Sequence, residues 1–269
     1  MTLAPFGRRL LRVTKNEQLG AYNMIWVGDP DGPEPEPGQF YMLAAERAWG
    51  GDDGRPYLPR AFSFARATDS ALAFLLEAIG PGTERLSRLE AHDGVWVTGP
   101  LGIGFSAPES GRPLLVGGGI GAAPLLCWRD ALGGLTPSVA GPPTTLLGFR
   151  SAQHAEAARY FHGAQIATDD GSVGHHGFVT ELLRQELDDD AHATIYACGP
   201  PPMLEAVRAL AAEREVPAQL AMESGMACGF GACMGCVVQT KNGYVRLCVD
   251  GPVVDAADLD TAWVPGAPH

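Results

Sequence analysis

Four of the six cysteines lie within the 21 residues from Cys228 to Cys248, and this cluster limits the fold more than any other feature. The spacing is Cys-x4-Cys-x2-Cys, through Cys233 and Cys236, with eleven further residues before Cys248. The first three cysteines match the spacing of plant-type [2Fe-2S] proteins. The sequence therefore predicts that these four cysteines bind a [2Fe-2S] cluster.

Glycines at positions 229, 231 and 235 would let the backbone wrap closely around a cluster and direct N–H groups at its sulfurs. A structural zinc site with four cysteine ligands is the alternative, although such sites usually pair two Cys-x2-Cys knuckles and this chain has one. Cys127 lies outside the pattern, in an apolar segment typical of a buried thiol.

Charge and hydropathy exclude several classes of partner. The chain has 19 basic and 31 acidic residues and a net charge of −12, which repels nucleic acid and anionic membranes. No apolar run is long enough to cross a bilayer, and the first residues do not resemble a signal peptide. These features predict a cytoplasmic protein with reduced thiols. A length of 269 residues suits two domains and a small appendage.

The first hundred residues alternate short β-rich runs with Gly, Pro and Asp clusters, which predicts a small antiparallel barrel. From Pro113 the pattern changes to strands alternating with helices, with helices expected around 154–161, 177–187 and 202–215. Such alternation is typical of an open parallel sheet with helices on both faces. The predicted fold is an antiparallel β-barrel domain (1–108), an α/β parallel-sheet nucleotide-binding domain (109–216) and a small C-terminal [2Fe-2S] domain (217–269).

Two segments of the predicted barrel could bind a flavin. The strand Arg60-Ala61-Phe62-Ser63 offers a cation for a phosphate, an aromatic ring and a hydroxyl, although an exposed strand often has such residues without a ligand. The turn Gly80-Pro81-Gly82-Thr83 precedes a predicted helix and could seat a pyrophosphate or serve only as a helix cap.

Two turns of the predicted parallel sheet could bind a nicotinamide nucleotide. Gly117-Gly118-Gly119-Ile120-Gly121 joins a strand to a helix, without the GxGxxG spacing of the Rossmann fingerprint. Cys198-Gly199-Pro200-Pro201-Pro202-Met203 follows a later strand, and the carboxyl ends of parallel strands face one crevice. Asp169 and Asp170 end the strand between them and could bond a ribose or cap a helix.

These segments occur in the order seen in the ferredoxin reductase superfamily, and with ESGMACGFGACMGC the chain resembles the electron-transfer subunits of type 1B dihydroorotate dehydrogenases. The resemblance implies that FAD binds at Arg60–Ser63, where Ala61 replaces the family's proline. It implies further FAD contacts at Leu75, Leu76, Glu77, Gly82 and Thr83. It also implies NAD(H) contacts at Gly118, Gly119, Ile120, Gly121, Gly199, Pro200 and Met203, with Cys198 as a catalytic residue near the nicotinamide.

The resemblance implies a relay in which FAD and a [2Fe-2S] cluster pass electrons between NAD(H) and the FMN of a separate dihydroorotate dehydrogenase catalytic subunit, in a heterotetramer of two plus two. It favours NADH over NADPH, as do Asp169 and Asp170, whereas Arg150 could meet a 2′-phosphate. The surface from Gly225 to Cys236 is the predicted docking region. Four apolar residues there either contact the partner or shield the cluster: Met222, Met226, Phe230 and Met234.

Other functions remain open at the level of sequence. A reductase subunit of a sulfide, sulfite or ferredoxin-linked complex would have similar domains. Oxygenase reductases usually have a longer gap before the fourth cysteine than the eleven residues here. A zinc-stabilised adaptor without flavin is the non-enzymatic alternative.

Overall fold

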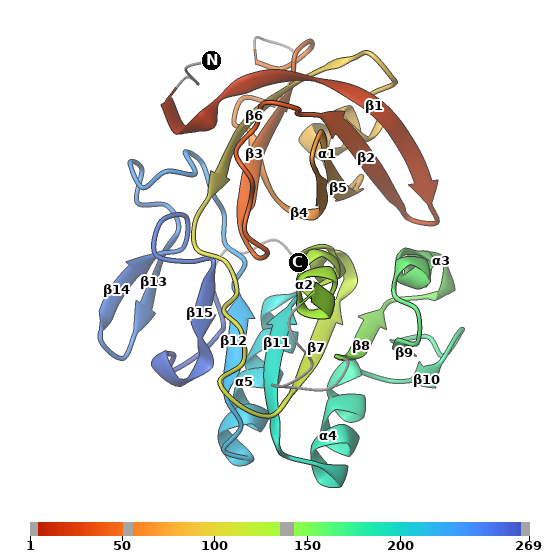
Figure 1. Cartoon of the computed structure of the whole chain (residues 1–269), viewed down its shortest axis with the longest axis vertical. Helices are drawn as coiled ribbons and strands as arrows, with labels where there is room; N and C mark the ends of the chain where they lie inside the picture. The colour runs from red at the N-terminus through yellow and green to blue at the C-terminus, as the bar shows by residue number, and fades with distance from the viewer. Residues whose placement is uncertain (1–4, 51–55, 135–142, 265–269) are drawn as a thin grey trace.

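A computed structural model describes residues 5–50, 56–134 and 143–264 of the chain. Its N-terminal part is a closed six-stranded barrel, as predicted, in the order β1-β2-β5-β4-β3-β6 with every neighbouring pair antiparallel (Figure 1). The strands are β1 (Arg9–Leu19), β2 (Tyr22–Gly28), β3 (Phe40–Ala45), β4 (Arg60–Thr68), β5 (Ala71–Glu77) and β6 (Gly94–Leu101). Apolar side chains fill the barrel, among them Phe64, Phe74 and Leu76.

The second part is a seven-stranded sheet in the order β10-β9-β8-β7-β11-β12-β15, parallel except for the last strand. The strands are β7 (Arg112–Gly118), β8 (Thr144–Phe149), β9 (Gln165–Thr168), β10 (His175–His176), β11 (Ala193–Cys198), β12 (Ala218–Ala221) and β15 (Val253–Asp255). All six residues of β11 are buried, as a central parallel strand requires.

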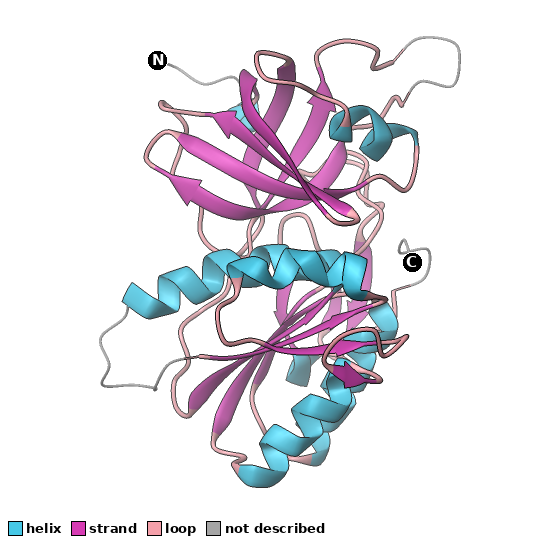
Figure 2. Cartoon of the chain, turned by 90° about the vertical axis from the view of Figure 1, so that its right-hand side faces the viewer, coloured by secondary structure: helices cyan, strands magenta, loops and turns pink. Residues whose placement is uncertain are grey.

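Helices cover both faces of this sheet, as predicted (Figure 2). Helix α2 (Ala122–Gly134) lies between the sheet and the barrel, and one apolar cluster joins the two parts, with Met24 and Leu75 of the barrel beside Leu125 and Trp128 of α2. Helices α4 (Val179–Asp189) and α5 (Pro201–Glu213) cover the opposite face. The order of strands and helices therefore turns the N-terminal end of α2 towards the barrel.

Two of the expected helices are shorter than predicted. The helix expected around 154–161 is α3 (Ala152–Ala155) followed by a 3-10 turn, Glu156–Tyr160. The carbonyl of Gln153 accepts the N–H of Ala21 from the β1–β2 turn, so it is not free to continue an α-helix. Helix α1 (Pro81–Ser87) ends one residue after the buried Leu86.

The segment after residue 216 packs on both earlier parts. Strands β12 and β15 belong to the parallel sheet, and β13 (Val237–Thr240) and β14 (Gly243–Arg246) form a separate hairpin. Cys236, Val238 and Cys248 share an apolar cluster with Phe40 and Met42 of the barrel. The predicted domain boundaries after 108 and 216 stay predictions, because the sheet itself continues past position 216.

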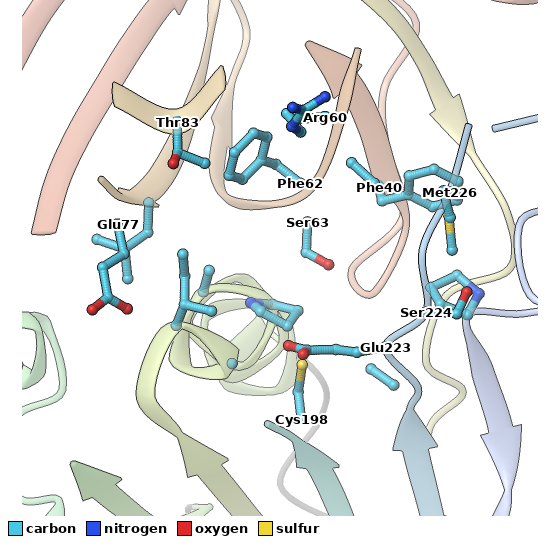
Figure 3. Close-up of a pocket in the computed structure, with 18 of the residues that line it drawn as sticks. Phe40, Arg60, Phe62, Ser63, Glu77, Thr83, Cys198, Glu223, Ser224 and Met226 are labelled. Carbon is cyan, nitrogen blue, oxygen red and sulfur yellow. The ribbon is translucent and has the colours of Figure 1, made fainter. Parts of the chain in front are cut away.

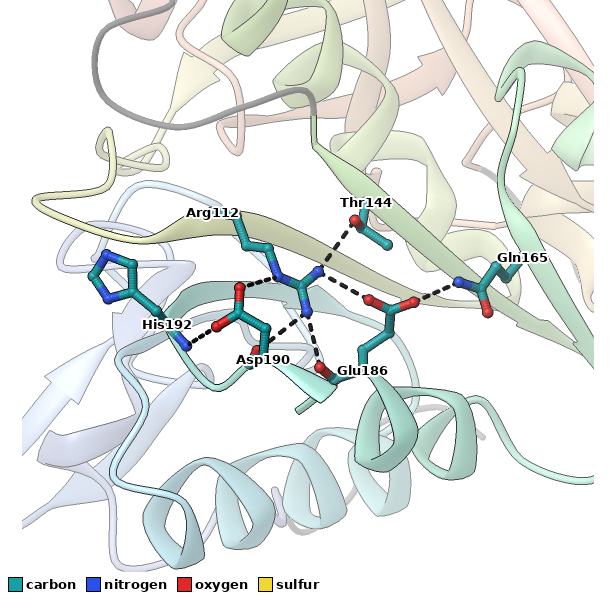
Figure 4. Close-up of polar contacts among 6 residues, drawn as sticks. All are labelled: Arg112, Thr144, Gln165, Glu186, Asp190 and His192. Atoms are coloured by element: carbon teal, nitrogen blue, oxygen red, sulfur yellow. Dashed lines mark hydrogen bonds and ion pairs between the residues drawn. The ribbon is translucent and has the colours of Figure 1, made fainter. Parts of the chain in front are cut away.

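The amino ends of the central strands are held together by Arg112, at the start of β7 (Figure 4). Its guanidinium contacts Thr144 Oγ1 at 3.2 Å, Glu186 Oε2 at 2.9 Å and Asp190 Oδ2 at 3.3 Å. Gln165 donates to the other Glu186 oxygen at 2.6 Å. One side chain therefore ties β7, β8, β9 and α4 together at the edge of the sheet away from the glycine turns.

Among the residues that the structure describes, no helix is long and apolar enough to span a membrane.

Candidate functional site

A pocket of about 510 Å3 lies where the barrel, the first turn of α2 and the segment after β12 meet (Figure 3). Three chain segments that are far apart in the sequence form its walls. The barrel side comprises Phe40, Arg60, Ala61, Phe62, Ser63, Leu75, Glu77, Ile79, Gly80, Pro81 and Thr83; the sheet side comprises Ile120, Gly121, Ala123, Pro124, Cys198 and Ala221; and the third wall comprises Met222, Glu223, Ser224, Gly225, Met226 and Pro252.

Ten of the predicted cofactor and catalytic residues line this pocket: Arg60, Ala61, Phe62, Ser63, Leu75, Glu77, Thr83, Ile120, Gly121 and Cys198. The remaining predicted residues are not part of its lining: Leu76, Gly82, Gly118, Gly119, Gly199, Pro200 and Met203. The side chain of Leu76 is fully buried in the barrel core, because it points opposite to its neighbours on β5. Gly118 and Gly199 lie against Met203. The flavin and nicotinamide segments thus face a single cavity.

On the barrel side, the Arg60 guanidinium lies against the turn that opens α1. A Cβ atom at Gly82 would lie 2.8 Å from Arg60 Nε, so a larger residue there would displace the guanidinium. Arg60 donates to the Leu58 carbonyl at 2.6 Å. The Thr83 hydroxyl accepts the N–H groups of Ile79 and Gly80 at 3.0 and 3.1 Å. Thr83 therefore caps the helix, which was one of its two predicted roles, and also lines the pocket.

On the sheet side, the glycine turn and the cysteine turn meet at adjacent strand ends. Cys198 pairs with Gly117 in the parallel register of β11 and β7. A side chain at Gly121 would overlap the Cys198 carbonyl, so this close approach requires glycine. Burial and the nearby Glu223 carboxylate raise the pKa of the Cys198 thiol well above its usual value. Cys198 therefore presents a neutral thiol to the pocket.

Sequence reasoning missed two polar residues of the pocket, Glu223 and Ser224. Burial raises the pKa of Glu223 from 4.5 to about 7. The Ser224 hydroxyl is buried without a hydrogen-bond partner in the described part of the chain. Both follow strand β12 after Met222, and a Glu-Ser pair just beyond a strand at the carboxyl edge of a parallel sheet is the signal that could have identified them.

The pocket mouth is bridged by an ion pair between the two parts of the molecule. The Glu77 carboxylate, at the end of β5, pairs with Arg150 from the end of β8, and His154 Nε2 lies 3.5 Å from the same oxygen. Figure 3 shows that Glu77 lies on the side of the pocket away from Ser224. The Arg150 guanidinium is therefore already matched by a carboxylate.

The four clustered cysteines lie as two neighbouring pairs. The sulfur of Cys228 is in hydrogen-bond contact with that of Cys233, and the sulfur of Cys248 with that of Cys236. Two thiolates on each of two irons is the ligand arrangement of a [2Fe-2S] cluster with four cysteines. The four residues therefore fit such a cluster in spacing and in pairing, while no group of three or more His, Cys, Asp or Glu side chains among the described residues lies close enough together to hold a single metal ion.

Backbone N–H groups point at these sulfurs. Gly231 donates to Cys248 Sγ at 3.1 Å and Gly235 to Cys233 Sγ at 3.4 Å. Desolvation raises the pKa of Cys228, but N–H groups from Phe230, Cys233 and Ala232 outweigh it and lower that pKa to about 6. Gly231 has a φ of +83°, which favours glycine. The N–H groups of this loop thus favour a thiolate at Cys228, whereas desolvation and the neighbouring Cys236 raise the pKa of Cys248 to about 12.

The outer face of this loop is apolar. Phe230 is 38% exposed and Met234 is 58% exposed, and the Phe230 ring stacks on Phe6 of the N-terminal segment with centroids 4.4 Å apart. Of the two roles predicted for Met222, partner contact does not fit, because Met222 is 4% exposed and lines the pocket; its packing in one apolar cluster with Cys236 and Cys248 agrees with the shielding role. Met226 is half-buried and also lines the pocket.

The chain matches two protein families. Residues 223–260 match the iron-sulfur cluster binding domain of dihydroorotate dehydrogenase B, and residues 149–209 match the oxidoreductase NAD-binding domain. The chain is 37% identical over 229 residues to the electron transfer subunit of dihydroorotate dehydrogenase B (NAD(+)) from Clostridium acetobutylicum, covering 84% of this chain and 87% of that protein. It is 35% identical to the subunit of that name from Geobacillus thermodenitrificans, covering 94% and 98%.

Among solved structures, the chain is similar to one from a study of flavin-based electron bifurcation by an NADH-dependent reduced ferredoxin-NADP oxidoreductase. The TM-score is 0.81 at 25% sequence identity, covering 94% of this chain and 90% of that one.

Proposed function

Since this chain belongs to the family of dihydroorotate dehydrogenase B electron transfer subunits, we propose that it relays electrons between NAD(H) and the FMN of a separate catalytic subunit. One observation carries the proposal. The wall formed by Ser224, Gly225 and Met226 belongs to the loop that reaches Cys228 two residues later, and this wall faces Arg60 and Cys198 across one pocket. The three cofactor segments therefore converge.

The barrel side of the pocket suits FAD. We assign to FAD the residues Arg60, Ala61, Phe62, Ser63, Leu75, Leu76, Glu77, Gly82 and Thr83, with Arg60 on a phosphate. The unpartnered Ser224 hydroxyl is a buried polar atom that a bound ring system with polar edges would satisfy. FAD would supply the conversion between a two-electron hydride and single electrons.

The sheet side suits the nicotinamide nucleotide. We assign to it Gly118, Gly119, Ile120, Gly121, Gly199, Pro200 and Met203, because the first turn of α2 offers N–H groups to a pyrophosphate. The neutral Cys198 thiol would pack against the ring that carries the hydride, as a catalytic contact rather than a nucleophile. The Glu223 carboxyl, beside Cys198, would respond to charge on that ring.

We propose that NADH is preferred over NADPH, because the Arg150 guanidinium is paired with Glu77 and so is not available to a 2′-phosphate. Glu77→Gln should release Arg150 and raise the catalytic efficiency with NADPH relative to NADH by up to about fivefold, since exposed ion pairs are worth about 0.2–1 kcal/mol. Arg150→Ala is the matched control and should give no such gain. Equal use of the two nucleotides by the unmodified protein would contradict the preference.

The cluster would carry electrons out of the chain. We assign Cys228, Cys233, Cys236 and Cys248 as its ligands, and the exposed face formed by Phe6, Phe230, Met234 and Val249 as the surface that meets the FMN subunit. Aromatic residues and methionine are enriched in protein interfaces. A heterotetramer of two plus two, and a cytoplasmic location that keeps the thiols reduced, complete the proposal.

We further assign FAD binding to residues 1–108, nucleotide binding to 109–216 and cluster binding to 217–269. The last unit shares β12 and β15 with the sheet of the second, which would hold the cluster rigidly beside the pocket. Phe40 lines the pocket and packs in the same apolar cluster as Cys236 and Cys248, so the distance for electron transfer is short.

A reductase subunit of another cluster-containing complex is a second candidate, and the similarity to the ferredoxin-NADP oxidoreductase study favours it. The isolated chain should reduce a dye with NADH and should not oxidise dihydroorotate. Adding an FMN-containing dihydroorotate dehydrogenase subunit should give a complex that couples dihydroorotate oxidation to NAD reduction. Dihydroorotate turnover by the isolated chain would contradict the division of labour, and coupling to ferredoxin alone would favour the second candidate.

A further inference from the structure

We propose that the Arg246 side chain raises the reduction potential of the cluster and that Asp250 limits this effect. The inference rests on the proposed function, because it takes Cys228, Cys233, Cys236 and Cys248 as the cluster ligands. It adds a residue that is not a ligand and whose role is electrostatic.

A tight turn places Cys248 between a cation and an anion. Arg246 ends β14, Cys248 follows two residues later, and Asp250 two residues after that. The Asp250 carboxylate accepts the backbone N–H of Arg246 at 2.8 Å and its Nε at 3.4 Å. The N–H groups of Val249 and Asp250 return to the Arg246 carbonyl at 2.9 and 2.8 Å. The turn therefore fixes both charges relative to the Cys248 sulfur.

The far end of the guanidinium reaches the opposite side of the cluster loop. A Cβ atom at Gly231 would lie 3.1 Å from Arg246 Nη1 and 2.8 Å from the Val249 side chain. Gly231 is the residue whose N–H donates to Cys248 Sγ at 3.1 Å. Arg246 therefore covers the backbone that hydrogen-bonds this sulfur, while Asp250 contacts the Nε side of the guanidinium.

Reduction of the cluster adds one negative charge, which a fixed positive charge nearby stabilises. Arginine stays protonated at every working pH, so its charge is constant. The Arg246 and Asp250 side chains are 37% and 40% exposed, so solvent and salt screen both. We therefore expect a change of about three- to tenfold in the ratio of reduced to oxidised cluster, which is roughly 30–60 mV at 59 mV per tenfold for one electron.

The test is a redox titration of the complete, cofactor-loaded protein, with the EPR signal of the reduced cluster as the readout. Arg246→Gln should lower the midpoint potential by about 30–60 mV, on the conversion just given. Arg246→Lys keeps the charge and should stay close to the unmodified protein. Asp250→Asn should raise the potential, because it removes the anion that opposes Arg246. Arg184→Gln is the matched control: Arg184 is an exposed arginine of α4 paired with Glu213 of α5, and this substitution should leave the midpoint potential unchanged.

Several results would overturn the inference. An Arg246→Gln protein with full iron and sulfide and an unchanged potential would do so, even if it bound the partner subunit more weakly. A fall in Arg246→Lys as large as in Arg246→Gln would also do so, as would a lower potential in Asp250→Asn. If the Arg246→Gln protein loses its cluster, the inference is tested by the other two variants: it holds if Arg246→Lys keeps the midpoint potential and Asp250→Asn raises it, and it fails otherwise. An unmodified protein without iron and sulfide would instead contradict the proposed function.

Discussion

Polar and charged side chains are paired with one another at the amino edge of the parallel sheet, whereas two of them at its carboxyl edge lack hydrogen-bond or ion-pair partners in the described part of the chain. At the amino edge, Arg112 is enclosed by Glu186, Asp190 and Thr144, with a hydrogen bond or ion pair for each nitrogen of the guanidinium. At the carboxyl edge, Glu223 is buried enough that desolvation alone raises its pKa to about 7, and the Ser224 hydroxyl has no partner among the described residues. The polar groups around Arg112 at the amino edge all have hydrogen-bond or ion-pair partners within the chain, whereas the carboxyl edge leaves the Ser224 hydroxyl without one in the part of the chain that the structure describes.

The contrast indicates which residues hold the fold and which await ligands. Buried polar groups in folded proteins are nearly always hydrogen-bonded, so an unpartnered group in a pocket is a candidate contact for a cofactor. Substitutions at the amino edge should therefore change stability and leave the cofactors in place. Substitutions at the carboxyl edge and in the loops beyond it should change cofactor binding or chemistry.

The largest effect should come from Cys248→Ala. Cys248 pairs with Cys236, so its loss leaves one iron with a single thiolate, and the cluster should not assemble. Iron and sulfide content and the visible spectrum provide the measurement. Cys127→Ala is the control, because Cys127 is buried on α2 and its sulfur contacts main-chain carbonyls of Phe64 and Pro124. A Cys248→Ala protein with full iron and sulfide would show that Cys248 is not a ligand.

Arg60→Ala should weaken FAD binding about ten- to a hundredfold. A charge-assisted hydrogen bond is worth roughly 1.5–3 kcal/mol, and about 1.4 kcal/mol corresponds to a factor of ten. Fluorescence titration of FAD into the flavin-free protein measures the change. Arg88→Ala is the control, because Arg88 lies at the end of α1, is 72% exposed and does not line the pocket; this variant should bind FAD normally. Unchanged affinity in Arg60→Ala would remove Arg60 from the FAD site.

Arg112→Met should destabilise the fold by about 2 kcal/mol, below the 3–5 kcal/mol of a fully buried pair because the Arg112 side chain keeps some exposure. The thermal midpoint should fall by roughly 4–8 °C. Arg184→Ala, which breaks the exposed pair with Glu213, should shift it little. FAD and cluster content should be normal in both variants. Loss of a cofactor in Arg112→Met would break the separation between the two edges.

Much of the fold followed from the sequence, because periodicity is a local property. Short β-rich runs separated by turn signals predicted the barrel, and the strand–helix order after Pro113 predicted the parallel sheet. The glycine turn was predicted to let a dinucleotide approach the backbone; in the structure Gly121 also makes room for the Cys198 carbonyl. The short α3 was not predictable in this way, since the β1–β2 turn takes the Gln153 carbonyl by a contact between the two parts.

The site was only partly predictable, for a similar reason. Motifs identified Arg60 at the start of β4, Gly121 in the turn after β7 and Cys198 at the end of β11; the register of β7 and β11 brings the last two together, and packing of the barrel on the sheet adds Arg60 to the same pocket. Glu223 and Ser224 belong to no motif, and their place after β12 is only a weak local signal, because their burial in the pocket depends on tertiary packing. Sequence also left open whether Met222 faces a partner or shields the cluster, and the structure shows it buried beside Cys236 and Cys248.

The smallest effect concerns the ionisation of Glu223. Because burial raises its pKa to about 7, the carboxyl is mostly neutral at pH 6 and mostly charged at pH 8. A nicotinamide ring becomes cationic as it gives up a hydride, and a nearby carboxylate stabilises that charge. The kcat/KM for NADH should therefore rise several-fold, on the order of tenfold at most, between pH 6 and pH 8. Glu223→Gln should remove this rise and match the unmodified protein at pH 6.

Stability provides the control, because it should change in the opposite direction. Below pH 4.5 the carboxyl is protonated in both the folded and the unfolded chain, so Glu223 contributes no pH dependence. Between pH 4.5 and about 7 the unfolded chain loses the proton first, so the folded flavin-free protein loses stability as pH rises, and above pH 7 the loss is constant. At about 1.4 kcal/mol per pKa unit, discounted for partial exposure, Glu223→Gln should gain roughly 1–2 kcal/mol at pH 8 and little at pH 4.5. If Glu223→Gln is slower and yet more stable at pH 8, the substitution has removed a charge that acts on the substrate. Loss of a contact that stabilises the fold would instead lower stability. A variant with an unchanged pH profile and unchanged stability at pH 8 would show that the Glu223 carboxyl has a partner in solution, and the contrast between the two edges would fail at this residue.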